Sequence, residues 1–456
     1  MNTPDKALKI AVIGSGPSGF YAAEALLRAG LPLQVDMLER LPTPFGLVRS
    51  GVAPDHPKLK EVIKVYDRIA RSPGFRFLGN VALGRDVTVA ELRAHYHAII
   101  LACGAQSDRC MGIPGEDLPG SHTATEFVGW FNGHPDYRDH AFDLGREVAV
   151  IVGQGNVAAD VCRILAKPVD ELRTTDISEH ALDALAQSRI REIHIIGRRG
   201  PAQARFTPRE LRELGEIHQC ATLADNRDLR LGEHCETELN DLQNGNAAKN
   251  CALFREFAAN QVGNRRRQIR FHFYLSPSEV LGDSRVEGLR VARNRLEGPA
   301  FAQVASATGE TTTLNCDLLF RSIGYRGVPI PGLPFDDHRG IVPNAVGRVT
   351  DGDHTVPGVY VTGWLKRGPS GVIGTNRADS VETVTHVLAD LTQADAVEKP
   401  GGDALEALFP ARGTRNLSYE EWLQIDEAEI ERGRPHGKPR EKFTRVRDML
   451  ALTGHG

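Results

Sequence analysis

Three glycines, Gly14, Gly16 and Gly19, form the first pattern in the sequence that could do chemistry. They lie in the run GSGPSG (14–19), after an apolar stretch at 9–13 and before an Ala/Leu-rich stretch at 20–29. Glycine at these three positions allows a tight turn, a close approach of backbone N–H groups to a pyrophosphate, and close packing of helix on strand. Glu39 follows Gly19 by 20 residues, at the distance of an acid that accepts hydrogen bonds from a ribose diol. The run with Ser15 and Glu39 therefore predicts a dinucleotide site; a structural glycine turn is the alternative.

A second turn of the same kind begins at Gly153. The apolar stretch 147–152 leads into GQGNVA (153–158), and the following helical stretch ends near Pro168. The next apolar stretch, 192–196, ends not in an acid but in Gly197-Arg198-Arg199-Gly200. Arginine suits a phosphate because its planar fork donates two hydrogen bonds at once, and a carboxylate there would repel a 2′-phosphate. This pattern predicts an NADP site; two solvated surface arginines are the alternative.

Two dinucleotide sites in one chain indicate one resident redox cofactor and one exchanging carrier. We expect FAD at the first, acid-terminated site and NADP(H) at the second. The Gly- and Pro-rich loop at 46–57 is too irregular for a strand or helix and is expected to pack on the flavin; it ends at His56, which is either functional or a surface or capping residue. The glycines at 368–374, before an apolar-faced helix that includes Val381, again suggest backbone N–H groups aimed at a ligand. Cys103 is expected to be a small apolar residue rather than a nucleophile.

Composition excludes several other classes of protein. The 55 Lys and Arg against 59 Asp and Glu give a net charge of −4, and aromatic residues make up 6%, so neither a nucleic-acid coat nor a stacking platform is indicated. The seven cysteines include no CxxC and no iron–sulfur spacing, so we expect no metal and no internal dithiol or cluster. No apolar stretch of about 18 residues occurs, and the N-terminus has neither a signal core nor an Arg-rich leader, which favours a cytoplasmic protein without a membrane segment.

Arginines gather in two places despite the acidic total. One group lies between residues 191 and 212, and the other comprises Arg265, Arg266, Arg267 and Arg270. Some of the first group would serve NADPH, and the rest could dock an acidic protein partner; a solvated surface is an equal alternative for the second group.

These patterns require an α/β fold of two Rossmann-like dinucleotide-binding domains, in a glutathione reductase-like arrangement. We expect the FAD domain to comprise residues 1–105 and 326–395, interrupted by an NADP domain at 106–325, with a linker and helical tail at 396–456 that packs on the FAD domain. The insertion at 168–189 is expected to be a surface excursion.

Several longer stretches resemble one known family. VDMLERLPTPFGLVRSGVAPDHPK (35–58), GQGNVAADV (153–161), GRRGP (197–201), SIGYRG (322–327) and above all GWLKRGPSGVIGTN (363–376) are similar to adrenodoxin reductase-type ferredoxin–NADP reductases, especially bacterial members. GAQSDR (104–109), IPGEDLPG (113–120), EFVGW (126–130) and GKPREK (437–442) extend the resemblance over essentially the whole chain.

The resemblance implies the contacts of each cofactor. FAD contacts fall on Gly19, Glu39, Leu47, Leu83, Trp364, Gly371, Val372 and Ile373. NADP contacts fall on Arg109, Gln154, Gly155, Asn156, Val157, Arg198, Arg199, Glu210 and Gly371. His56, Asp160 and Glu213 would lie near the reacting nicotinamide and flavin, with His56 and Glu213 tuning the site electrostatically and Asp160 helping to position the nicotinamide. Relatives can carry other small or aliphatic residues at Gly19 and Leu83, and some carry a fused ferredoxin that this sequence lacks.

The implied activity is hydride transfer from NADPH to FAD, followed by single-electron transfer to a ferredoxin-type iron–sulfur protein or a flavodoxin, with no protein nucleophile. Two alternatives remain. One is an NADPH-oxidising electron-input subunit similar to the small subunit of glutamate synthase, although the expected cysteine-rich N-terminal segment is missing. The other is a flavoprotein that senses NADP and signals by conformation.

Overall fold

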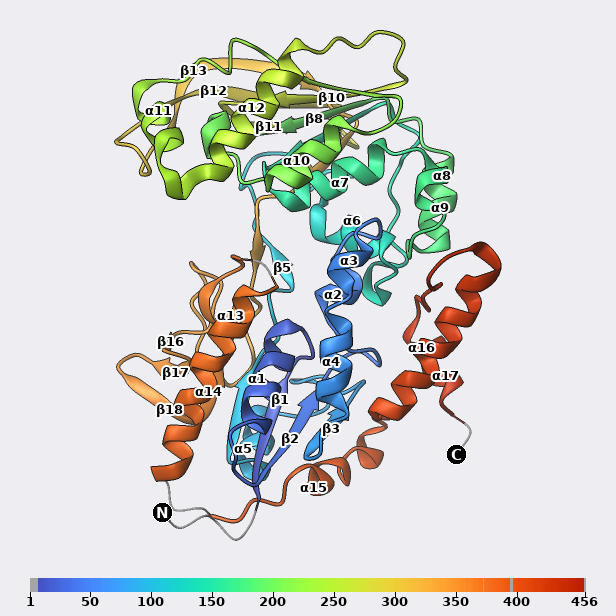
Figure 1. Ribbon diagram of the computed structural model, residues 1–456, viewed down its shortest axis with the longest axis vertical. Helices are drawn as coiled ribbons and strands as arrows, with labels where there is room; N and C mark the ends of the chain where they lie inside the picture. Colours follow the sequence, from blue (N-terminus) through green and yellow to red (C-terminus); the bar gives the residue numbers. More distant parts are fainter. Residues whose placement is uncertain (1–6, 372, 394–396, 455–456) are drawn as a thin grey trace.

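The computed structural model describes residues 7–371, 373–393 and 397–454 and shows two lobes, each built around its own sheet (Figure 1). The first lobe takes its strands from both ends of the chain, in the order β16-β17-β18-β4-β1-β2-β3. The strands from β18 to β3 are parallel, as expected for a sheet covered on both faces. Their bounds are β1 (Leu8–Ile13), β2 (Leu33–Leu38), β3 (Phe75–Leu78), β4 (Ala98–Leu101), β16 (Asn344–Ala345), β17 (Arg348–Asp351) and β18 (His354–Val361).

Alternate residues of the central strand supply two separate cores. Ile10 and Val12 pack with α1, α4, α14 and the tail helix α16 (Tyr419–Gly433), whereas Ala11 and Ile13 pack on the other face with α5 and α15 (Gly402–Glu406). The helices of this lobe are α1 (Pro17–Leu27), α2 (Leu47–Ser50), α3 (Pro57–Lys60), α4 (Ile63–Ala70), α5 (Val89–His95), α13 (Trp364–Arg367) and α14 (Thr375–Gln393).

The second lobe contains a six-stranded parallel sheet in the order β6-β14-β7-β8-β10-β9. Helices cover one face, and a three-stranded antiparallel sheet covers part of the other. The strands are β6 (Ser121–Thr123), β7 (Val148–Val152), β8 (Glu192–Ile196), β9 (Cys220–Ala224), β10 (Arg267–His272), β11 (Leu275–Leu281), β12 (Gly288–Glu297), β13 (Val304–Asn315) and β14 (Leu318–Arg321). The helices are α6 (Ala124–Phe131), α7 (Asn156–Ala166), α8 (Val169–Leu172), α9 (Glu179–Ala186), α10 (Pro208–Gly215), α11 (Glu233–Asn240) and α12 (Gly245–Ala259).

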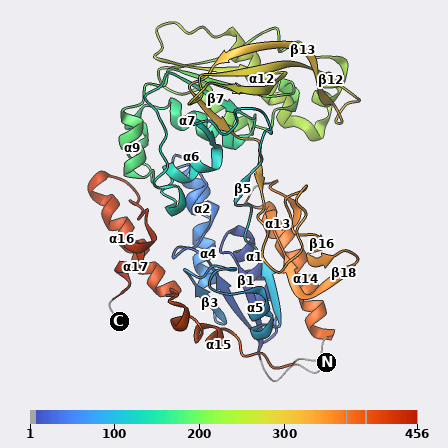
Figure 2. The ribbon, with the colours of Figure 1, turned by 180° about the vertical axis from the view of Figure 1, so that it is seen from behind.

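The lobes are joined by two chain crossings that pair as a short antiparallel ribbon, β5 (Ser107–Asp108) with β15 (Tyr325–Arg326). From the first lobe, α2 and α3 extend to the second lobe (Figure 1). The C-terminal tail runs along the side of the molecule opposite α14, as the view from behind also shows (Figure 2). Its helices are α15 (Gly402–Glu406), α16 (Tyr419–Gly433) and α17 (Val446–Leu452). Single 3₁₀ turns lie at Pro135–Tyr137, Pro201–Gln203, Leu242–Asn244, Pro410–Arg412 and Arg434–His436.

Three expectations about local structure were wrong. The loop at 46–57 contains the helix α2, which Gly46 starts and Gly51 ends, and α3 begins directly after it at Pro57. The insertion at 168–189 is not a surface excursion, because α9 buries Ala181, Leu182 and Leu185 in the core of the second lobe. Val381 is 46% exposed rather than packed, since only Val384 and Val387 of that face are buried. Within the described residues, no helix is both long and apolar enough to cross a membrane.

Candidate active site

The first glycine turn leaves the start of α1 open to a ligand. Gly14 has φ +103°, and a Cβ there would lie 2.6 Å from the carbonyl oxygen of Ala102, so only glycine fits. A Cβ on Gly19 would collide with the carbonyl oxygen of Gly14. By contrast, the space beside Gly16 is open, and no side chain caps α1, which Gly16 begins. The free N–H groups at this helix end suit the pyrophosphate of a dinucleotide.

Glu39 lies at the end of β2, directly beside this turn. Its Oε2 accepts hydrogen bonds from the backbone N of Ser15 at 3.1 Å and from Ser15 Oγ at 2.7 Å, and its Oε1 accepts one from the N of Leu41. The carboxylate is thus held at the edge of the pyrophosphate position, where a ribose diol of FAD would reach it. Cys103 lies close by, and burial raises the pKa of its thiol to about 12, so it stays protonated at neutral pH and offers no nucleophile.

The flavin end of the predicted site contains an unsatisfied polar atom. Trp364 Nε1 is buried and has no hydrogen-bond partner among the described residues, and the Trp364 ring stacks on Tyr325 with centroids 5.2 Å apart. An orphaned donor of this kind fits a cofactor that brings an acceptor. Leu47 is 38% exposed on α2, whereas Leu83 packs on the core of the other sheet face. Ile373 packs near α14, Gly371 lies against Thr375, and Val372 is outside the described residues.

The second glycine turn repeats the geometry of the first. Gly153 has φ +130°, and a Cβ there would collide with the carbonyl oxygen of Ser322; the space beside Gly155 is open, and no side chain caps α7. Gln154 Nε2 donates to the carbonyl oxygen of His272 at 3.0 Å, and Asn156 Oδ1 accepts from the N of Thr207 at 2.8 Å. These two side chains therefore brace the turn, while Val157 packs on the core and backbone groups remain for the ligand.

Three arginines gather beyond this turn. Arg198 and Arg199 follow β8, and Arg205 joins them because its backbone bridges to Gly155. Burial lowers the pKa of Arg199, the positive charges of Arg205 and Arg198 lower it further, and the negative charge of Glu238 opposes them. No ion pair with a carboxylate joins any of them in the part of the chain that the structure describes. An unneutralised cluster of this kind is suited to a 2′-phosphate. Arg109, by contrast, is exposed after β5 in the connection between the lobes.

A buried ionic cluster joins the two lobes beside these turns. His56 comes from the first lobe, and its Nε2 lies 2.9 Å from Glu213 Oε2 of α10. Its Nδ1 lies 3.6 Å from Glu210 Oε1, so Glu210, predicted to contact NADP, belongs to this cluster. At the centre is Arg163 of α7, whose side chain is 1% exposed. Arg163 donates to Asp55 at 2.6 and 3.1 Å, to Asp160 at 2.6 Å and to Glu210 at 3.0 Å.

The shared guanidinium acts differently on its two aspartates. Burial opposes the ionisation of Asp55, but Arg163 and Lys167 outweigh it and hold the pKa of Asp55 below its usual range. Burial raises the pKa of Asp160 to about 6, because Arg163 only partly offsets it and Glu210 adds to it. Hydrogen bonds from His56 and Arg209 lower the pKa of Glu213 despite its burial. Burial also raises the pKa of Tyr325, with contributions from the charges of Asp108 and Asp160, so the Trp364–Tyr325 stack lies near this cluster.

Sequence reasoning missed Arg163 and Asp55 as site residues, whereas Arg205 was predicted only as a member of the arginine group that could serve NADPH. Arg163 interrupts the apolar stretch VCRILA, and a charge at such a position is the signal that could have identified it. The ligand atoms of His56, Glu210 and Glu213 lie within 4.8 Å of one another, as in metal sites. Here the Arg163 guanidinium, bonded to Glu210 and 3.9 Å from Glu213, supplies the positive charge between these groups.

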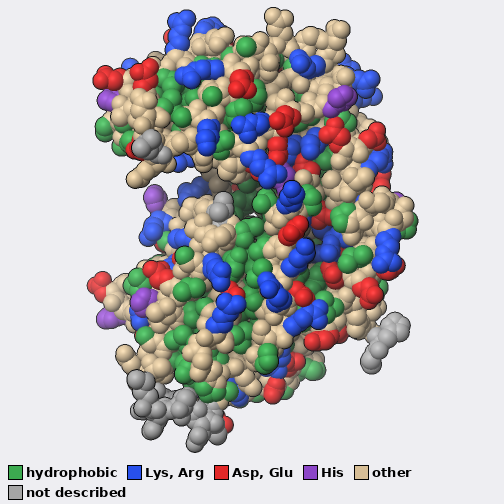
Figure 3. All heavy atoms as spheres, in the orientation of Figure 1, with side chains coloured by type: hydrophobic (Ala, Val, Ile, Leu, Met, Phe, Trp, Pro, Cys, Tyr) green, Lys and Arg blue, Asp and Glu red, His purple; other side chains and the backbone are tan. Residues whose placement is uncertain are grey.

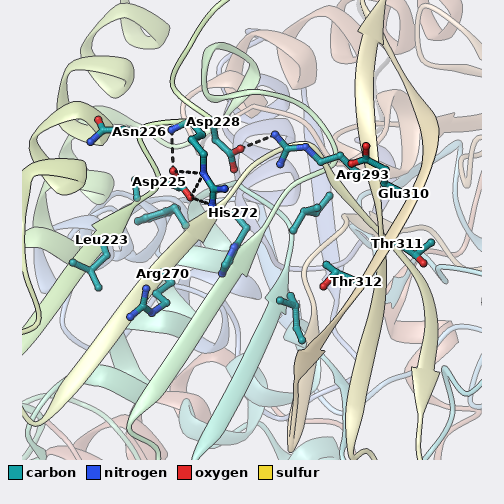
Figure 4. A pocket seen from close by; sticks show the side chains of 15 residues that line it. Leu223, Asp225, Asn226, Asp228, Arg270, His272, Arg293, Glu310, Thr311 and Thr312 are labelled. Atoms are coloured by element: carbon teal, nitrogen blue, oxygen red, sulfur yellow. Dashed lines mark hydrogen bonds and ion pairs between the residues drawn. The ribbon is translucent and has the colours of Figure 1, made fainter.

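The surface is hollowed between the lobes (Figure 3). A separate cavity of about 730 Å³ lies on the second lobe between β9, β10 and β13, lined by charged, polar and apolar side chains (Figure 4). Its charges are largely paired, with Asp225 bonded to Arg227 and Asp228 to Arg293. No glycine of either turn lines it, so it is distinct from both nucleotide sites.

Comparison with known proteins identifies close relatives. Residues 8–195 match the family model described as pyridine nucleotide-disulphide oxidoreductase. The chain is 44% identical to the NADPH-ferredoxin reductase FprA of Mycobacterium leprae, covering 98% of both chains. It is also 44% identical to the mitochondrial NADPH:adrenodoxin oxidoreductase of Bos taurus, covering 100% of this chain and 94% of the relative. The structure of Mycobacterium tuberculosis FprA in complex with NADPH superposes with a TM-score of 0.93 at 42% identity, over 98% of this chain and 100% of that one.

Replacing Arg198 and Arg199 together by glutamine tests the phosphate site. Each charge-assisted hydrogen bond contributes about 1.5–3 kcal/mol, so the double variant should bind NADP⁺ roughly 10²- to 10⁴-fold more weakly. Affinity for NAD⁺, which has no 2′-phosphate, should stay within a few-fold, and titration calorimetry measures both. Equal losses for the two nucleotides would show that the arginines do not read the phosphate.

The raised pKa of Asp160 predicts a pH-dependent stability. Between about pH 4 and pH 6 the folded protein holds a proton on Asp160 that the unfolded chain has released, so this group's contribution to stability falls as pH rises through that window. The unfolding free energy of Asp160→Asn minus that of the parent should therefore increase by up to about 3 kcal/mol across the window and be constant above it. Urea unfolding from pH 4.5 to 8 measures the difference; a difference independent of pH would contradict the assignment.

Proposed function

The chain belongs to the family of NADPH–ferredoxin and adrenodoxin reductases, and from this premise we propose that it oxidises NADPH on a bound FAD and passes the electrons singly to a ferredoxin-type iron–sulfur protein. The observation that carries the proposal is the pair of open helix ends, one beside a carboxylate and the other beside three unpaired arginines. Only the second suits a 2′-phosphate. We accordingly assign FAD to residues 1–105 and 326–395 and NADP(H) to residues 106–325.

The chain's own groups bind and orient the two nucleotides. The backbone N–H groups at Gly16 and Gly155 would bind the two pyrophosphates, Ser15 holds Glu39 where it would accept from the FAD ribose, and Arg198 and Arg199 would hold the 2′-phosphate of NADP. Bound FAD supplies the redox chemistry, since it accepts a hydride and can release electrons one at a time. Trp364 Nε1 would donate a hydrogen bond to the bound flavin. The Tyr325 ring stacks on the indole ring of Trp364 and so holds it in place.

The inter-lobe cluster supplies charge near the reacting rings. In this proposal His56 and Glu213 tune the electrostatics through their 2.9 Å contact, and Asp160 orients the nicotinamide end. Arg163 keeps Asp55 ionised, so the first-lobe loop and α7 stay together while the nucleotides exchange. Water exclusion follows from the burial of Arg163 and His56, whose side chains are 1% and 7% exposed.

The likeness over nearly the full chain favours this function over an electron-input subunit similar to the glutamate synthase small subunit. For the acceptor, the relatives are named for ferredoxin and adrenodoxin, so we propose a small [2Fe–2S] protein first and a flavodoxin as the second candidate.

We propose that exposed arginines of the second lobe dock this acidic partner. Of the second arginine group, Arg267 is occupied because it donates to the carbonyl oxygens of Ala166 and Lys167 at the end of α7, and Arg270 pairs with Glu192. Arg265 and Arg266 are exposed; Arg265 Nη1 donates to the carbonyl oxygen of Gln261 at 2.7 Å, but neither arginine pairs with a carboxylate among the described residues.

The proposed reaction is tested by anaerobic stopped-flow bleaching of the flavin, followed by reduction of an added [2Fe–2S] ferredoxin. NADPH should reduce the flavin at least tenfold more efficiently than NADH, because only NADPH engages Arg198 and Arg199 with a phosphate. The reduced enzyme should then reduce ferredoxin catalytically. The reaction type is wrong if NADPH leaves the flavin oxidised, and the acceptor is wrong if neither ferredoxin nor flavodoxin is reduced.

The docking surface is tested by the variant Arg265→Glu/Arg266→Glu in the same assay. Charge reversal should raise the KM for ferredoxin several-fold at low ionic strength, and the difference should shrink in high salt as the charges are screened. Flavin bleaching by NADPH serves as the internal control and should be unchanged. An unaltered KM at every salt concentration would remove these two residues from the interface.

A further inference from the structure

The ribbon between the lobes is too small to hold their orientation by itself. It pairs only two residues from each strand, Ser107 and Asp108 with Arg326 and Tyr325. Lobes joined in this way are expected to move relative to each other unless a larger interface fixes them. Hydride transfer between nucleotides held on different lobes needs reacting atoms about 3–3.5 Å apart, so the orientation must be fixed elsewhere.

The C-terminal tail contacts both lobes. On the first lobe, α16 buries Trp422 and Ile425, which are 1% and 0% exposed, and Glu429 forms an ion pair with Arg49 of α2 at 2.5 Å. The segment after α16, residues 438–445, contacts the second lobe through three ion pairs. There Arg445 pairs with Asp139 at 2.6 Å.

At this contact, three buried charges come from three parts of the chain. Asp176 of the second lobe lies between Lys60 of α3, at 2.7 Å, and Lys442 of the tail, at 3.0 Å. The Lys442 side chain is 2% exposed, and burial lowers its pKa to about 7 against the attraction of Asp176. Removing one member of such a group leaves the others buried without compensation, so the arrangement is held strongly.

The tail also completes the start of α9. No side chain of the neighbouring residues caps this helix, and the backbone N of its first residue, Glu179, donates to Glu441 Oε1 at 3.1 Å. Lys438, 1% exposed, pairs with both Glu179 and Glu441. The second lobe therefore depends on the tail for a helix cap as well as for a charge partner.

We propose that residues 438–445 are a clamp that sets the orientation of the second lobe against the first, with Lys442 as a positioning residue for hydride transfer from NADPH to the flavin. This inference rests on the proposed function. The clamp acts through lobe orientation rather than through contact with either nucleotide, so its loss should slow hydride transfer while nucleotide affinity is kept.

The test compares Lys442→Met with Ile425→Ala in the FAD-loaded protein. Ile425 is a matched control because it is buried in the same tail but packs only on the first lobe. Lys442→Met should slow flavin bleaching at saturating NADPH by roughly 10- to 100-fold, since misplacement by about 1 Å has that effect. The Kd for NADP⁺ should stay within about twofold, because Lys442 lies outside the nucleotide turns. Ile425→Ala should lower the Tm at least as much and leave the bleaching rate within about twofold.

A second readout does not depend on activity. Amide hydrogen exchange should accelerate at Glu179 and in the β5–β15 ribbon of Lys442→Met, but not in Ile425→Ala. Lys438→Met, which removes the other tail ammonium, provides the same comparison should Lys442→Met fail to fold. Equal bleaching rates in the lysine variants and the parent, or equal slowing in Ile425→Ala, would overturn the clamp. Absence of bleaching in the parent would instead overturn the proposed function.

Discussion

The contact between Arg163 and Asp55 is the interaction on which the active-site side of the lobe junction is built. It brings a fully buried cation of α7 against a carboxylate of the first-lobe loop, 108 residues earlier in the chain. Burying a guanidinium is costly unless its nitrogens find acceptors, and each of the three guanidinium nitrogens of Arg163 donates to a carboxylate, with acceptors from both lobes. Because the same loop carries His56, the bond that joins the lobes also brings His56 to Glu213. The contact between His56 and Glu213 therefore follows from the ion pair that neutralises Arg163 at the lobe junction.

The two nucleotide turns share the same backbone geometry and differ in the charged side chains that lie beside them. Both use a glycine with positive φ whose Cβ position is blocked by a carbonyl oxygen, and both leave the following helix without a side-chain cap. The difference lies one strand further, at Glu39 in one lobe and at Arg198 and Arg199 in the other. A carboxylate accepts from a diol, whereas arginines at close range lose stability through mutual repulsion unless an anion binds. The lack of a carboxylate ion pair on Arg198, Arg199 and Arg205 among the described residues therefore favours a phosphate at this position.

The parts of this structure that could be predicted from the sequence are those that depend on neighbours in the chain. The strands 9–13 and 192–196 were predicted within one residue, because alternation and glycine turns are local signals. The fold class and the cofactors follow from the same turns, and the relatives bear them out. The roles of individual site residues remain predictions, although the structure brings His56, Asp160, Glu210 and Glu213 together around Arg163.

The parts that could not be predicted depend on contacts between distant residues. Arg163 has no local acceptor except Asp160, so its buried position is decided by Asp55 and Glu210. The segment at 168–189 resembled a surface excursion because its apolar residues alternate with acids, and the tail that covers Asp176 lies 266 residues away from it. Such partners leave no periodic signal in the chain, since ion pairs need only two matching side chains and tolerate any separation in sequence. The internal fold of the second lobe can therefore be predicted from the local pattern of apolar residues and glycines. Its position on the first lobe cannot, because that position depends on ion pairs between residues far apart in the sequence.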